Sequence, residues 1–414
     1  MSAKNKGLAN RMKEISPLSV YIHCHGHLLN LAVKDTLSCV KILKDSLGTV
    51  QSLYNFIEAS PKRHAIYMKV ENNAESGFIR VLKSQSVTRW TCHYEAVRAV
   101  SEEFERVILS LNHIENDETS DSKTTSQAKA LLLNILDFEF VFGVELLNVI
   151  LIQTSKLSSY LQSKKVDIRT ARLQANLVIK VLEMMRGEDE FNRLFEKTEK
   201  IIKTTEDLLK QKEIDYEIRP AKISRRSKFS GDIKQFYRVT NYYEGLDKLV
   251  KELQMRFAGK GQETLTHLAT MIFDRDVQDE TFEAVSKFYG LDLDILKADH
   301  KLFLHYKDKL EKQDMTAAEM FKKLTETNLI QLLPEFSKAL EIFAVLPVSS
   351  CEAERSFSLL RRLKTYLRNT MGQERLSSWT LMHIERATVN QVIQQDMKEL
   401  IDKFGRKGRD SHFF

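Results

Sequence analysis

The sequence predicts a mainly α-helical protein. Its 414 residues include only 14 glycines and 5 prolines, under half of the roughly 12% that average usage gives these two residues. Few glycines and prolines mean few tight turns, which argues against sandwich, barrel and propeller folds. Charged residues make up 29% of the chain and apolar residues 43%. The interleaving of the two kinds is typical of long amphipathic helices.

One short strand is expected near the start. Residues 18–23 (LSVYIH) are rich in β-type side chains and lie between helix-like segments. A lone strand needs a sheet to satisfy its backbone groups, and nothing after Trp90 predicts one. The segments predicted as helices are 5–14, 28–40, 50–59, 95–114, 128–161 (two helices broken near Gly143), 166–186, 191–212, 241–257, 263–273, 280–289, 316–325, 349–369 and 374–404. Residues 115–125 are an expected acidic loop and 213–231 an expected linker.

Charge and cysteine usage exclude several classes of protein. The net charge of +6 is too mild to indicate a polyanion partner by itself. The four cysteines follow no disulfide framework, which favours a reduced, intracellular protein. The most apolar window, 138–152, contains Glu139, Glu145 and Asn148, so it predicts a core helix and not a membrane span. The first eleven residues are polar, unlike a signal peptide.

A cluster of histidines and a cysteine has the residue types of a metal site. Cys24 and His27 have the spacing of zinc ligands. A full site needs a second pair, and the neighbours Cys92 and His93 would point about 100° apart on a helix. The alternative is a packed corner with hydrogen-bonded histidines.

Two segments have the composition of nucleic-acid contacts. Arg89 and Trp90 could bind a phosphate and stack on a base, although a core tryptophan behind a capping Thr88 is the simpler interpretation. Residues 219–238 hold seven basic residues against one acidic residue, with three aromatic residues interleaved. This pattern suits a nucleic-acid backbone or a nuclear-import signal, and it also suits a solvated linker.

The last predicted helices are strongly patterned. Ser349 and Glu352 form a capping box that would start a helix over 349–369. One face of that helix is apolar and another carries Glu354 among arginines, a face that could be a solvated surface or could hold a metal and phosphates. The helix over 374–386 is apolar around most of its circumference, so it must be buried in the fold or against a partner.

Together these segments resemble the hAT superfamily of transposases and genes derived from them, with the zinc-finger MYM-type protein 1-like branch as the nearest. The resemblance rests on the C-x-x-H-x-L-N-L run at 24–31, the T-R-W element at 88–90, the segment 157–171 and the long segment 347–384. The last of these resembles the hAT C-terminal dimerisation region.

The resemblance implies an RNase H-like catalytic domain split by a helical insertion. The implied domains are a truncated remnant with one or few strands (1–95), an all-helical insertion (96–340), a dimerisation region that completes the RNase H-like part (341–405) and a disordered tail (406–414). Glu354 matches the family's metal-binding glutamate. The two aspartates that complete the site for Mg²⁺ or Mn²⁺, and the zinc finger, are expected upstream of Met1, which would explain the orphan strand.

The resemblance also assigns roles to side chains. The implied DNA contacts are Arg89, Trp90, Arg225, Arg226, Lys228, Arg355, Arg361 and Arg362. The implied dimerisation or core residues are Phe357, Leu360, Leu363, Leu367, Leu376, Trp379, Leu381 and Ile384. Cys24 and His27 remain the candidate metal ligands.

The leading hypothesis is a domesticated or truncated hAT transposase-like protein. It would be catalytically inactive, would bind no cofactor productively, and would act in the nucleus, with the cytoplasm as a second location. Its expected partners are further copies of itself and DNA, with a role in transcriptional regulation, and neither a membrane nor a small-molecule substrate is expected. One alternative is a fragment of an active transposase whose N-terminus is missing from the gene model, with Mg²⁺ or Mn²⁺ as its cofactor. Another is a helical scaffold with no nucleic-acid role.

Overall fold

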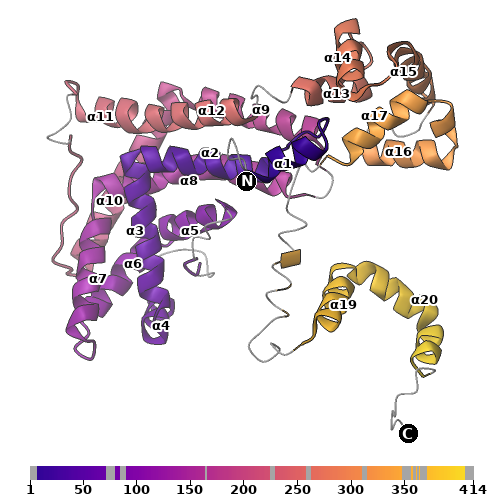
Figure 1. The fold of residues 1–414 in the computed structure, drawn as a ribbon. Helices are drawn as coiled ribbons and strands as arrows, with labels where there is room; N and C mark the ends of the chain where they lie inside the picture. Colours follow the sequence, from indigo (N-terminus) through magenta and orange to yellow (C-terminus); the bar gives the residue numbers. More distant parts are fainter. Residues whose placement is uncertain are drawn as a thin grey trace. The chain divides into compact units, whose positions relative to one another are not determined.

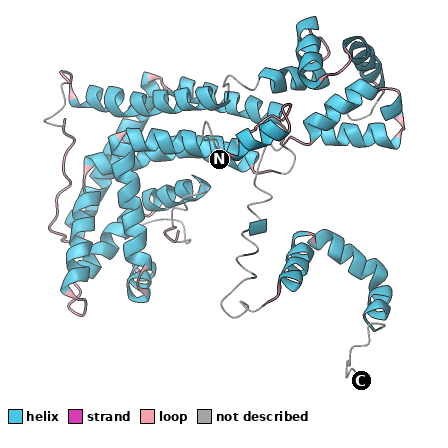
Figure 2. Cartoon of the chain, in the orientation of Figure 1, coloured by secondary structure: helices cyan, strands magenta, loops and turns pink. Residues whose placement is uncertain are grey.

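The computed structural model describes residues 7–70, 80–83, 90–163, 166–223, 229–257, 263–309, 315–346, 356–357, 360, 363 and 371–405. It divides into two compact units, Met1–Ser349 and Ser350–Phe414 (Figure 1). Over the described residues the regular structure is helical, as Figure 2 shows, apart from one isolated bridge between Asp137 and Arg219. The mainly α-helical prediction is confirmed.

The first unit carries most of the helices. In chain order they are α1 (Leu8–Ile15), α2 (His25–Cys39), α3 (Lys41–Glu58), α4 (Pro61–Lys69), α5 (Trp90–Glu102), α6 (Phe104–Glu115), α7 (Ser122–Ile135), α8 (Phe138–Leu161), α9 (Ile168–Met185), α10 (Glu188–Gln211), α11 (Ile233–Phe236), the π-helical η1 (Tyr237–Tyr243), α12 (Glu244–Phe257), α13 (Glu263–Phe273), α14 (Asp279–Tyr289), α15 (Leu293–Lys307), α16 (Ala317–Glu326), the 3₁₀ turn η2 (Leu329–Gln331) and α17 (Pro334–Ala344). The second unit contains α19 (Gln373–Ile384) and α20 (Arg386–Gly405).

Helix α8 lies at the centre of the first unit. Helices α3, α5 and α10 pack along it, and α2 and α9 also contact it. Within the described part of the chain it is the one helix long and apolar enough to cross a membrane, yet most of its apolar window is buried inside the unit. The sequence prediction of a core helix here is confirmed. Helices α13 to α17 pack mainly on one another at one end of the same unit.

The expected strand at residues 18–23 is not formed. The segment has no strand partner among the described residues and leads into α2. Its side chains dock instead, since Ile22 is buried in the core and Val20 packs partly against it. Val, Tyr and Ile favour a strand only where a neighbouring strand can complete the hydrogen-bond ladder.

Two helix boundaries also differ from the prediction. The segment 95–114 is divided at Glu103 into α5 and α6. The break expected near Gly143 lies at Asp137, whose carboxylate accepts the Glu139 backbone N–H at 2.8 Å and caps α8. Helices α4, α15 and α17 were not predicted, although Pro61, Asp292 and Pro334 are ordinary helix-start residues.

Gly143 instead allows α8 to approach α3 closely. A Cβ at this position would lie 2.1 Å from Ser46 Oγ and 3.2 Å from Ile42 Cγ1. We expect Gly143→Ala to lower the free energy of unfolding by about 1–3 kcal/mol, because overpacking forces the helices apart. Chemical denaturation measures this change. Gly48→Ala is the matched control on α3, where nothing lies within 4 Å of the added carbon, and a comparable loss there would contradict the account.

The raised pKa values of four tyrosine side chains indicate that the protein loses stability at alkaline pH. Burial raises the pKa values of Tyr67, Tyr237 and Tyr242 above their usual range. Burial, followed by the hydrogen bond to Glu115, raises the pKa of Tyr216 to about 12. A raised folded-state pKa means that stabilisation is complete below the unfolded value of about 10 and is lost as the pH rises through the folded value.

We therefore expect the thermal unfolding midpoint to fall as the pH rises above about 10. In a native-state absorbance titration, part of the 12 tyrosines should ionise only when the protein unfolds. Tyr216→Phe removes one of the raised groups and should make the fall shallower. Titration of every tyrosine at its ordinary pKa in the folded protein would contradict this prediction.

Candidate functional site

The second unit exposes an apolar surface on α19. Trp379, Leu381 and Ile384 are 39%, 62% and 45% exposed, whereas Leu376 is half-buried. The helix begins after Gly372, whose backbone is extended, and ends at Glu385. The sequence predicted that this helix is buried either in the fold or against a partner. In the single chain these three side chains are exposed, and their assignment to dimerisation or to a core stays a prediction.

Helix α20 continues the apolar pattern. Ile393, Met397, Leu400 and Phe404 are exposed and follow one another at three- or four-residue spacing, which places them on one face of the helix. Asp396 has a non-helical backbone, so the helix is kinked there. We call the exposed apolar side chains of the two helices the C-terminal apolar surface: Trp379, Leu381, Met382, Ile384, Ile393, Met397, Leu400, Ile401 and Phe404. Many exposed large apolar side chains on two consecutive helices are typical of a protein–protein interface.

The helix predicted over 349–369 is described at only a few positions. Phe357 is 70% exposed, whereas Leu360 and Leu363 are half-buried. The assignment of these residues to dimerisation or to a core stays a prediction. Outside the described residues lie Glu354, Arg355, Arg361, Arg362 and Leu367.

The basic segment 219–238 is partly neutralised by the fold. Arg219 forms an ion pair with Asp137, Nη2 to Oδ2 at 3.0 Å, and donates to the Leu133 carbonyl at 2.7 Å. Arg238 pairs with Glu188. The charge of the segment 219–238 alone does not predict these two ion pairs, because the acidic partners come from other parts of the chain.

The aromatic residues interleaved with those basic residues belong to the core. Tyr237 is fully buried, with ring centroids 5.0 Å from those of Phe138 and Phe142. Phe236 is buried beside it, and Phe229 packs on Phe236. The buried rings of Phe236 and Tyr237 are therefore part of the core and are not exposed on the surface. Arg225, Arg226 and Lys228 lie outside the described residues, as does Arg89, and of Trp90 only the backbone at the start of α5 is described.

The histidine cluster forms a packed corner at the start of α2. Cys24 is the N-cap residue. His25 is buried with its ring 5.7 Å from that of Phe257, and the His23 ring meets the edge of Tyr21 at 4.6 Å. Among the described residues no group of three His, Cys, Asp or Glu side chains is placed to hold a metal ion. Cys24 and His27 therefore find no third ligand there, and the geometry supports the packed corner.

Two family models match parts of the chain. The ZBED1 RNase-like helical domain matches residues 22–138, and the hAT family C-terminal dimerisation region matches residues 305–388. The second match spans α16, α17, α19 and the first residues of α20, so it includes the α19 part of the C-terminal apolar surface. Neither model names the zinc-finger MYM-type 1-like branch, which stays a prediction.

Similar curated proteins are about twice as long as this chain. The mouse (Mus musculus) and human (Homo sapiens) proteins named "52 kDa repressor of the inhibitor of the protein kinase" are each 23% identical to it. The alignments cover 97% of this chain and 53% of each relative. The chain therefore spans about half the length of these relatives.

Proposed function

We propose that this chain, parts of which match the ZBED1 RNase-like helical domain and the hAT dimerisation region, is a transposase-derived member of the hAT superfamily that acts by pairing with a second copy of itself. The observation that carries the proposal is the exposed C-terminal apolar surface, part of which lies in the segment matched by the hAT dimerisation region. Covering apolar surface stabilises a complex by roughly 25 cal/mol for each Å² removed from water. A second copy would present the same apolar residues, as a two-fold interface requires.

The second part of the proposal is that this chain regulates and does not cut DNA. It is supported by the described residues, which contain no group of three potential metal ligands, and by the word "repressor" in the printed names of the relatives. Two-metal cleavage needs several carboxylates around one site. No bound cofactor is part of this proposal.

A nicking assay on supercoiled DNA with Mg²⁺ or Mn²⁺ tests this part. We expect no cleavage by the 414-residue chain, and no difference between it and the Glu354→Gln variant. Metal-dependent nicking that Glu354→Gln abolishes would contradict the proposal and would favour an active transposase fragment.

The third part is that the dimer binds DNA in the nucleus. It is supported by the cluster of basic residues over 219–238, and Lys222 in that segment is exposed. Phosphate contacts release counterions, so the logarithm of the binding constant should fall linearly with the logarithm of the salt concentration. Gel-shift titrations at several salt concentrations test this. Failure to bind any DNA at low salt would favour the helical scaffold.

A further inference from the structure

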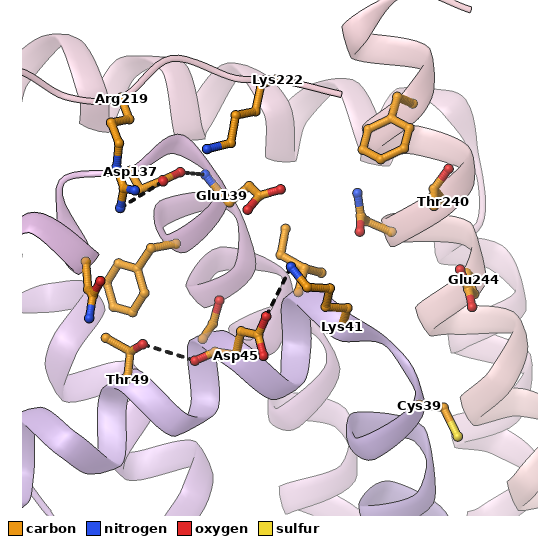
Figure 3. A pocket seen from close by; sticks show the side chains of 16 residues that line it. Cys39, Lys41, Asp45, Thr49, Asp137, Glu139, Arg219, Lys222, Thr240 and Glu244 are labelled. Carbon is orange, nitrogen blue, oxygen red and sulfur yellow. Dashed lines mark hydrogen bonds and ion pairs between the residues drawn. The ribbon is translucent and has the colours of Figure 1, made fainter. Parts of the chain in front are cut away.

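A groove of about 1000 Å³ opens in the unit Met1–Ser349. Its walls come from α3, from the start of α8, and from η1 with the first turn of α12, and residues of the segment 219–222 line one end (Figure 3). Ile42, Phe140 and Phe236 supply its apolar lining. The groove contains none of the residues assigned above to self-association.

Part of the charge in the groove is already paired. Lys41 Nζ lies 3.4 Å from Asp45 Oδ2, and Arg219 Nη2 lies 3.0 Å from Asp137 Oδ2 (Figure 3). Each pair brings one positive and one negative charge. The net charge offered to a ligand therefore depends on the other side chains that line the groove.

Two polar residues that are mostly buried also line the groove. Ser46 is 3% exposed and Asn241 is 8% exposed, and both line the groove. Neither residue is among those with a fully buried side-chain N or O atom that lacks a partner, so their polar atoms are accessible from the groove. A ligand in the groove can therefore form hydrogen bonds with the Ser46 hydroxyl and the Asn241 amide.

Unpaired carboxylates in the groove outnumber the unpaired cations. Glu139 and Glu244 line it and form no ion pair with the described residues, while Lys222 adds one positive charge near Arg219 (Figure 3). Asn241 and Glu244 are three residues apart across the junction of η1 with α12, a spacing that places both side chains on one face. Short π-helical segments such as η1 often mark functional sites.

We propose that this groove binds an extended peptide segment that carries a lysine or arginine. An asparagine amide both donates and accepts, so Asn241 can hold the C=O and the N–H of a peptide backbone together. Side chains along an extended chain alternate at about 3.3 Å per residue. A backbone held at Asn241 therefore brings a neighbouring cationic side chain to Glu244, with Glu139 on the opposite wall.

Fluorescence anisotropy of the full chain with a labelled peptide, Gly-Ser-Arg-Gly-Ser-Arg-Gly-Ser, tests the proposal. We expect saturable binding, and no binding when glutamate replaces both arginines. Asn241→Ala and Glu244→Gln should each weaken binding about tenfold, since each removes a hydrogen-bonding or charged partner. Glu280→Gln, which changes an exposed glutamate on α14 outside the groove, is the matched control and should leave binding unchanged.

Three results would overturn the proposal. The arginine peptide could fail to bind, both groove variants could bind it as tightly as the control does, or a single-stranded oligonucleotide could compete for the groove more strongly than the peptide. Unfolding midpoints of the variants equal to that of the parent chain show that the groove is intact. A variant that cannot self-associate should still bind the peptide.

Discussion

Replacing Arg106 by methionine should lower the free energy of unfolding by about 3–5 kcal/mol, because the change leaves a buried carboxylate without its counter-charge. Arg106 is only 4% exposed. Its Nε donates to Glu103 Oε2 at 2.9 Å, and its Nη1 donates to the carbonyl oxygens of Tyr67, at 3.2 Å, and Val70. The guanidinium thus joins α6 to the end of α4.

Chemical denaturation measures the Arg106→Met effect, and Arg98→Met is the matched control. The Arg98 side chain on α5 is 42% exposed and pairs with Glu102 four residues away, a kind of pair whose loss costs about 0–1 kcal/mol. Adding Glu103→Leu to Arg106→Met should recover part of the stability, since no lone charge then remains buried. A loss at Arg106 no larger than that at Arg98 would show that the buried pair is not important to the fold.

The double variant Leu381→Asp, Ile384→Asp should weaken self-association by about 100-fold or more, because each aspartate would place a charge where an apolar contact forms. Leu381 and Ile384 are both exposed in the single chain, so α19 should still fold in the variant. Sedimentation equilibrium measures the change.

The matched control for that variant is Leu173→Asp, Leu177→Asp. These leucines are also exposed, one turn apart on α9, but they lie outside both matched segments. We expect the control to associate like the parent chain. Equal weakening by both double variants would mean that association is general apolar adhesion and not a property of the C-terminal apolar surface.

The helical class was predictable because it depends on local pattern. Few breakers and amphipathic spacing were enough to find most helices of the first unit. The strand at residues 18–23 could not be excluded in that way, because a strand depends on a neighbour that local sequence does not specify. Likewise Gly143 suggested a break, whereas its actual role depends on how closely Ser46 approaches from another helix.

The candidate site was predictable in its chemistry and not in its surroundings. The apolar character of α19 was evident from spacing, but a helical wheel cannot distinguish burial in a core from burial against a partner. The positive charge of the segment 219–238 was evident from the sequence. The ion pairs of two of its arginines with Asp137 and Glu188 were not. The groove combines side chains from distant segments, and no local motif marks it.

The central claim is that two copies of this chain associate, and static light scattering of the purified chain over a range of micromolar concentrations tests it most directly. We expect a molar mass of twice the 48.0 kDa of one chain, falling toward the single-chain value in the Leu381→Asp, Ile384→Asp variant. A mass of 48.0 kDa for the parent chain at every concentration would contradict the claim.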